Sequence, residues 1–154
     1  MSSYEILKII HIVSACLLLG SGIGGLSAII GLNQCACEAL LRRFLPITLF
    51  VSTLLLIIFA LVQSLTGFAI ISQQHYAWRS EWVMGIWMSF SASALCYLTA
   101  LYFQLRCCHI LQQSGLCADY QRYYQKSLWM SLPLSLFLFI LYFLMSNILQ
   151  HFLL

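Results

Sequence analysis

One ionisable side chain, His11, lies well inside a long apolar run of this sequence. A neutral imidazole can ligate a metal or the iron of haem, and it can also donate or accept a hydrogen bond. In a later apolar run, Gln63 and Thr66 are three residues apart, which places them on one face of a helix. Polar groups inside a membrane are costly and usually face protein. These three residues are therefore the leading candidates for a buried functional site.

The chain that must position them has 154 residues, of which 62% are apolar or aromatic and 7% are charged. A soluble domain has about a quarter of its residues charged, so the composition excludes an ordinary soluble protein. Its high hydrophobicity also excludes a disordered chain. Four apolar runs each exceed the roughly 18 residues that predict a membrane-spanning helix. They cover residues 6–32, 44–72, 82–105 and 128–149.

We therefore predict an all-α fold, an integral membrane four-helix bundle with short loops. Lipid offers the backbone no hydrogen-bond partners, so each apolar run must be a helix. Pro46 is expected in the first turn of the second helix, where its missing N–H costs little. Residues 1–154 would form a single transmembrane domain, with helices at about 5–32, 44–72, 82–107 and 127–150.

The basic residues predict the orientation of the bundle. Five of the seven lysines and arginines fall in the first and third loops, namely Arg42, Arg43, Arg106, Arg122 and Lys126. Basic residues accumulate in cytoplasmic loops, so we expect these loops in the cytoplasm and both termini outside. We predict a multi-pass protein of the bacterial inner membrane that contacts lipid. It would bind no nucleic acid, because its basic residues bracket apolar runs.

This orientation places Thr66 at about the depth of His11, and Gln63 about one turn deeper. Ser14 shares the His11 stripe with several small residues, which let helices approach closely. The imidazole is thus expected to point toward protein rather than lipid. If the helix faces converge, a polar cluster would form around His11, and further polar residues belong to the same half of the bundle, namely Ser89, Tyr142, Ser146 and Asn147.

Two interpretations of this cluster remain open. His11 could be an axial ligand of haem b, with Gln63 and Thr66 contacting the imidazole or the propionates, since ligand histidines usually have a partner on the other ring nitrogen. Alternatively, His11 only forms hydrogen bonds to Gln63 or Thr66 and fixes the helix register. The sequence has no hydrolytic, nucleotide-binding or conventional zinc motif. No spacing selects a second axial ligand among Met84, Met88, Met145 and His75.

Short segments along nearly the whole chain resemble, in order, a bacterial family of predicted integral membrane proteins called domain of unknown function 2269. The resemblance implies a fold and no established activity. Its segments are Leu7-Lys8-Ile9-Ile10-His11 with Gly20 and Gly22, Gln63-Ser64-Leu65-Thr66-Gly67, Trp82, Gln104-Leu105-Arg106, Arg122, Trp129 and Leu144-Met145.

The first helix is more distantly similar to that of HemJ-type protoporphyrinogen oxidases, a helical membrane family associated with b-type haem. This similarity implies that His11 is a haem ligand. Those enzymes have a lysine early in their third helix, whereas Trp82-Val83-Met84-Gly85-Ile86 has none, so enzymatic activity stays open. Two alternatives need no haem. One is a non-catalytic accessory or structural subunit of a larger membrane complex, and the other is a small oligomeric transporter with His11 and Gln63 in its path.

Overall fold

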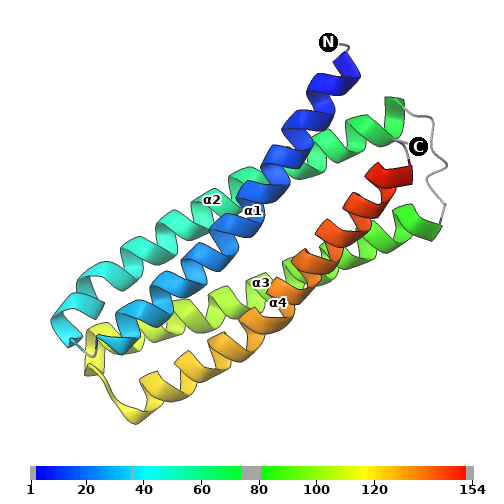
Figure 1. Ribbon diagram of the computed structural model, residues 1–154. Helices are drawn as coiled ribbons and strands as arrows, with labels where there is room; N and C mark the ends of the chain where they lie inside the picture. The colour runs from blue at the N-terminus through cyan, green and yellow to red at the C-terminus, as the bar shows by residue number, and fades with distance from the viewer. Residues whose placement is uncertain (1–2, 36, 74–80, 152–154) are drawn as a thin grey trace.

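The protein forms four long helices in a computed structural model that describes residues 3–35, 37–73 and 81–151 (Figure 1). These helices are α1 (Ser3–Gln34), α2 (Glu38–Gln73), α3 (Glu81–Ser114) and α4 (Ala118–His151). The predicted all-α fold is confirmed. The α1–α2 and α3–α4 turns lie at one end of the molecule, which we call the hairpin end. The beginning of α1 and the end of α4 lie at the opposite end, the termini end.

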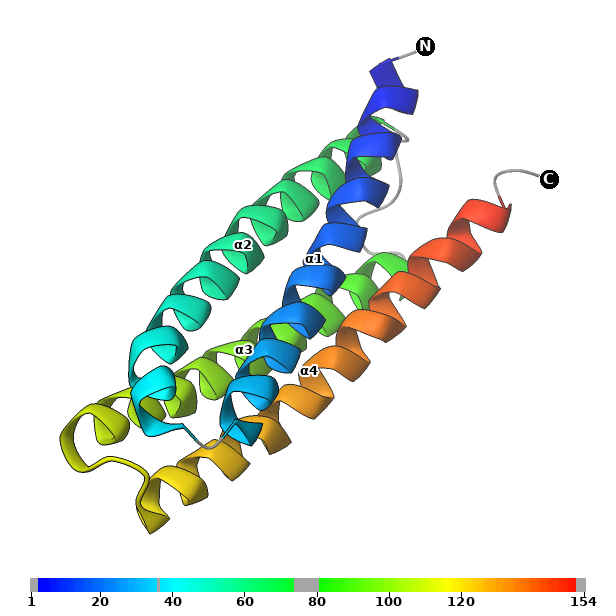
Figure 2. The ribbon, with the colours of Figure 1, turned by 60° about the vertical axis from the view of Figure 1, so that its left-hand side comes forward.

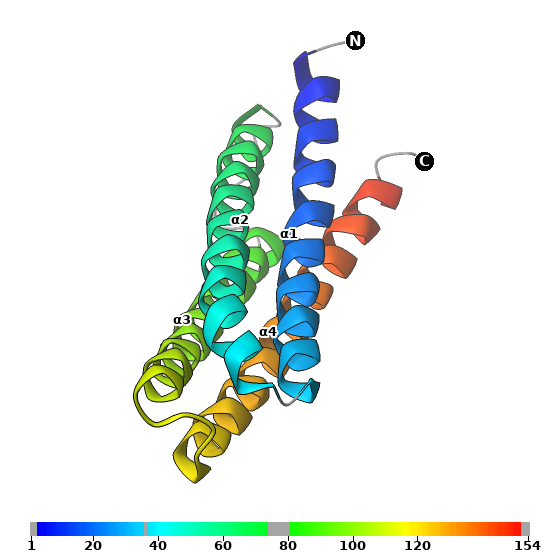
Figure 3. The ribbon, with the colours of Figure 1, turned by 90° about the vertical axis from the view of Figure 1, so that its left-hand side faces the viewer.

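The four helices pair as two antiparallel hairpins, α1 with α2 and α3 with α4. Most contacts between helices are made within a hairpin, and fewer are made from one hairpin to the other. The hairpins lie side by side at the hairpin end and are farther apart toward the termini end (Figures 2 and 3). The first and third loops therefore share one end of the molecule, as the distribution of basic residues predicts.

The helices are longer than a bilayer requires. They contain 32 to 36 residues each, whereas about 20 residues cross the hydrocarbon core. Three helical segments of the described chain are long and apolar enough to span a membrane, namely 3–34, 38–73 and 83–114. Their outward-facing side chains are largely apolar, as contact with lipid requires. The fourth membrane span, in α4, stays a prediction.

At the hairpin end, helical structure continues beyond the apolar runs. The carboxylate of Glu38 and the guanidinium of Arg42, one turn apart, form an ion pair at 2.7 Å that supports the first turn of α2. Arg42 also donates to the carbonyl of Gln112 at 3.3 Å, one of the last carbonyls of α3. Because α2 begins at Glu38, Pro46 lies inside the helix. The expectation of a first-turn proline is therefore wrong, since the polar residues before it remain helical.

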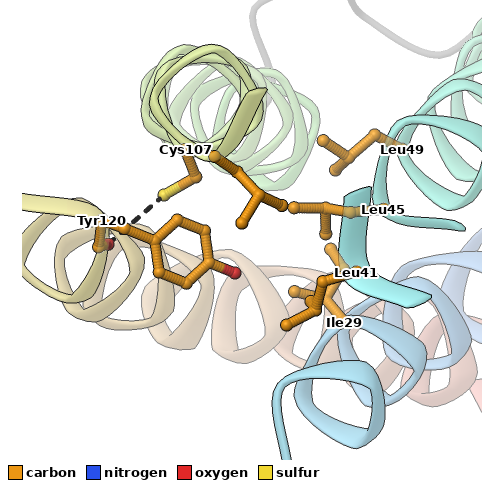
Figure 4. Close-up of a cluster of buried hydrophobic side chains, with 7 residues drawn as sticks. Ile29, Leu41, Leu45, Leu49, Cys107 and Tyr120 are labelled. Atoms are coloured by element: carbon orange, nitrogen blue, oxygen red, sulfur yellow. Dashed lines mark hydrogen bonds between the residues drawn. The ribbon is translucent and has the colours of Figure 1, made fainter. Parts of the chain in front are cut away.

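A cluster of buried side chains joins the two hairpins at this end (Figure 4). It takes residues from all four helices, and Leu41 on α2 has no exposed surface. The Tyr120 side chain of α4 is 1% exposed, and its hydroxyl donates to Asn33 Oδ1 of α1 at 2.7 Å. We call this group the hairpin-end core, and its members are Ile29, Leu41, Leu45, Leu49, Cys107, Leu111 and Tyr120.

Alkaline pH is expected to weaken the hairpin-end core through Tyr120. Burial raises the pKa of Tyr120, which precedes the apolar part of α4, from 10.0 to about 12. The folded protein therefore favours the neutral phenol. The resulting stability is complete below about pH 10 and is lost as the pH rises toward about 12. The melting temperature in detergent should fall more over this interval for the wild type than for Tyr120→Phe, which cannot ionise. Equal falls would contradict the prediction.

Candidate functional site in the first helical hairpin

His11 lies on α1 toward the termini end and faces α2. Its side chain is only 7% exposed, whereas the neighbouring Ile10 and Ile12 are exposed on the outer surface. A Cβ atom added to Gly67 of α2 would lie 3.2 Å from Cε1 of the ring. The imidazole therefore packs against the backbone of α2, and this close approach depends on glycine. The prediction that His11 points toward protein is confirmed.

Both ring nitrogens of His11 form hydrogen bonds within the hairpin. Nδ1 lies 2.7 Å from Oγ1 of Thr66, and Nε2 lies 2.9 Å from the amide nitrogen of Gln63. The Ser14 hydroxyl lies 2.6 Å from Oε1 of Gln63 and 2.9 Å from the His11 carbonyl oxygen. These four side chains form one network, which we call the His11 cluster.

The partners of the ring determine where its proton lies. The Thr66 hydroxyl donates to the carbonyl of Val62 at 2.7 Å, so its oxygen accepts the Nδ1–H of His11. The Gln63 amide nitrogen can only donate, so Nε2 of His11 accepts. The network is thus satisfied by a neutral imidazole with its proton on Nδ1. The Nε2 lone pair, the one that could ligate a metal, is directed at Gln63.

The structure brings together part of the polar group expected from sequence. His11, Gln63, Thr66 and Ser14 converge as predicted. Among the described residues, Ser89 forms no hydrogen bond to them; its carbonyl accepts from Ser93 on the same helix. The other residues expected in that half of the bundle have side chains outside the described part of the chain, namely Tyr142, Ser146 and Asn147.

The second-ligand candidates are only partly described. Met84 and Met88 of α3 are 50% and 70% exposed. Both side chains are therefore largely exposed rather than buried against another helix. His75 and the side chain of Met145 lie outside the described residues. The His11 cluster, as its described side chains define it, therefore contains one imidazole, that of His11, and no methionine.

A second feature, which sequence reasoning missed, is a cavity where the hairpins meet, with several polar side chains in a mostly apolar lining. This cavity has a volume of about 50 Å³, is partly open, and is lined by residues of all four helices. Its serine hydroxyls donate to carbonyls of their own helices, so their lone pairs remain available as acceptors. Single serines within apolar runs do not predict such a cavity, because they come together only through the relative rotation of the helices, which the sequence does not show. The polar lining residues are Ser21, Ser52, Tyr97, Gln104 and Ser131.

Long apolar helices with hydrogen-bonded polar clusters between them define a helical integral membrane protein. A family model described as "Predicted integral membrane protein (DUF2269)" matches residues 5–147. The chain therefore belongs to the DUF2269 family, and the resemblance found in its short segments is confirmed. No curated protein and no solved structure matches the chain significantly. The likeness to HemJ-type oxidases stays a prediction.

Proposed function

We propose that His11 is the axial ligand of a haem b and that this small membrane protein takes part in membrane redox chemistry. The observation that supports this proposal is the ordered, neutral imidazole. Thr66 holds Nδ1 at 2.7 Å and leaves the lone pair on Nε2. Ligand histidines are oriented in this way, through a hydrogen bond on the nitrogen that does not bind the metal.

The residues of the His11 cluster fit one axial position of a haem. Gln63 now caps Nε2 at 2.9 Å, and rotation of its long, half-buried side chain would open that position while Thr66 still holds the ring. The displaced amide could then donate to a propionate. When bound, haem iron supplies electron-transfer or oxygen chemistry. The residues of this chain would orient the imidazole and limit the access of water.

The orientation proposed with this function follows from the charges at the hairpin end. The helix ends there are rich in basic residues, among them Arg42 and Arg43 of α2 and Arg106 of α3. We infer that this end lies in the cytoplasm of a bacterium and that the protein resides in the inner membrane. The His11 cluster would then lie in the outer half of the bilayer.

An absorption spectrum tests the haem proposal. Wild-type protein purified in detergent from cells with ample haem should keep a Soret band after washing, and His11→Ala should lose it. His11→Asn retains hydrogen-bonding groups but supplies no imidazole, so it should also lose the band while remaining folded. His109→Ala, which removes an exposed histidine at the hairpin end, should keep it. A folded wild type without the band would refute the proposal.

A second function is favoured by the outer face of α1. Gly20 and Gly24 are one turn apart, and nothing lies within 4 Å of a Cβ atom added to either. Such a face suits close contact with another membrane helix. It supports a non-catalytic accessory or structural role in a larger membrane complex or a homo-oligomer. A purified particle with a stoichiometric partner subunit and no Soret band would favour this function over haem binding.

A further inference from the structure

Three aromatic rings form a continuous row across α3 and α4 at the hairpin end. The centroids of Tyr102 and Phe103 on α3 are 5.5 Å apart. The Phe103 centroid lies 6.2 Å from that of Tyr123 on α4. The row therefore links the two helices of this hairpin. The Tyr102 ring is exposed, and the other two rings are half-buried.

Two cations lie over this row. The guanidinium carbon of Arg106 is 5.7 Å from the Tyr102 centroid, and its Nε donates to the Tyr102 hydroxyl at 3.3 Å. The ammonium of Lys126 is 6.0 Å from the Phe103 centroid and 5.7 Å from that of Tyr123. Cation–π contacts do not use N–H donors, so the terminal nitrogens of Arg106 and the ammonium of Lys126 can still donate to an anion.

Neither cation is neutralised by an acid within the described chain. The ion pair found there joins Arg42 and Glu38, and neither Arg106 nor Lys126 has a carboxylate within salt-bridge distance among the described residues. Both side chains are exposed. Two oriented, unpaired cations on adjacent helices form a surface that is complementary to an anion.

We propose that Arg106 and Lys126 bind the phosphate of an anionic phospholipid between α3 and α4 at the hairpin end. Their depth favours a lipid over a soluble anion. Arg106 directly follows the apolar run 82–105, and Lys126 shortly precedes the run 128–149. Basic groups beside an apolar run, on a row of aromatic rings, lie at the level of the lipid headgroups.

Lipid retention measured by native mass spectrometry tests the site. Full-length protein is reconstituted in equal parts of phosphatidylcholine and phosphatidylglycerol, and the lipids that remain bound are counted. The wild type should retain phosphatidylglycerol preferentially. Arg106→Gln and Lys126→Gln should each lower that preference about fivefold. Arg43→Gln, which removes the same charge from an exposed position on α2 at the same end, should leave it unchanged.

Two further measurements make the outcome decisive. Lys126→Arg keeps the charge and should keep most of the preference, which separates charge from general damage to the fold. Inorganic phosphate is added as a competitor and should not displace the lipid. An equal loss with Arg43→Gln would show a general effect of positive charge and overturn the site. Displacement by inorganic phosphate would overturn the assignment to a lipid.

Discussion

Leu41→Ala is expected to lower the free energy of unfolding by about 2–5 kcal/mol. Leu41 has no exposed surface and contributes to the hairpin-end core, where residues of all four helices meet. Leu41 lies before the apolar run that begins at residue 44. Its burial is therefore driven by the hydrophobic effect, which does not drive contacts between helices inside lipid. Truncation would leave a cavity that the four surrounding helices cannot easily close.

Leu40→Ala is the matched control for this substitution. Leu40 precedes Leu41 in α2, and its side chain is 38% exposed. Removing it deletes the same atoms but opens no interior cavity, so the expected cost is below about 1 kcal/mol. Reversible unfolding in mixed micelles, followed by circular dichroism, measures both variants. Equal costs would show that the hairpin-end core does not hold the hairpins together.

Gly25→Ala is expected to destabilise the α1–α2 hairpin by about 1–3 kcal/mol. A Cβ atom at this position would lie 2.8 Å from Cβ and 3.3 Å from Oγ of Ser52. The nearer atom is fixed to the backbone of α2, so a rotamer change cannot relieve the overlap. The two helices must separate instead, which would also disturb the cavity that both residues line.

The adjacent Gly24 provides the control because it tests the same substitution outside the contact with Ser52. Nothing lies within 4 Å of a Cβ atom added to Gly24. Alanine there should be neutral or stabilising by up to about 1 kcal/mol, because alanine has a higher helix propensity than glycine. Gly25→Ala should therefore lower the melting temperature, whereas Gly24→Ala should raise it or leave it unchanged. A loss from Gly24→Ala as large as that from Gly25→Ala would contradict this packing.

The fold was largely predictable because lipid restricts the possible structures. Each long apolar run must be a helix, and short connections make successive helices antiparallel. The helix ends were less predictable, because polar residues can continue a helix. The Glu38–Arg42 ion pair supports the first turn of α2, and this support depends on side-chain geometry that hydropathy does not report.

The His11 cluster was predictable to the extent that its residues are rare in apolar helices and share helical faces. His11, Gln63 and Thr66 stand out by type, and their depths match in an antiparallel hairpin. The hydrogen bond from Tyr120 to Asn33 was not predictable. It joins helices from different hairpins, whose relative rotation is set by packing and leaves no periodic signal in either segment. Binding of haem by His11 remains a proposal.

The uneven distribution of contacts between the hairpins has a mechanical consequence. The hairpin-end core joins all four helices, whereas the hairpins lie farther apart toward the termini end. A rotation of one hairpin against the other would therefore pivot at this core and displace the opposite end most. Because His11 and its hydrogen-bond partners all belong to the α1–α2 hairpin, they would move together with their hydrogen bonds intact. Only the distance between the His11 cluster and the α3–α4 hairpin would change.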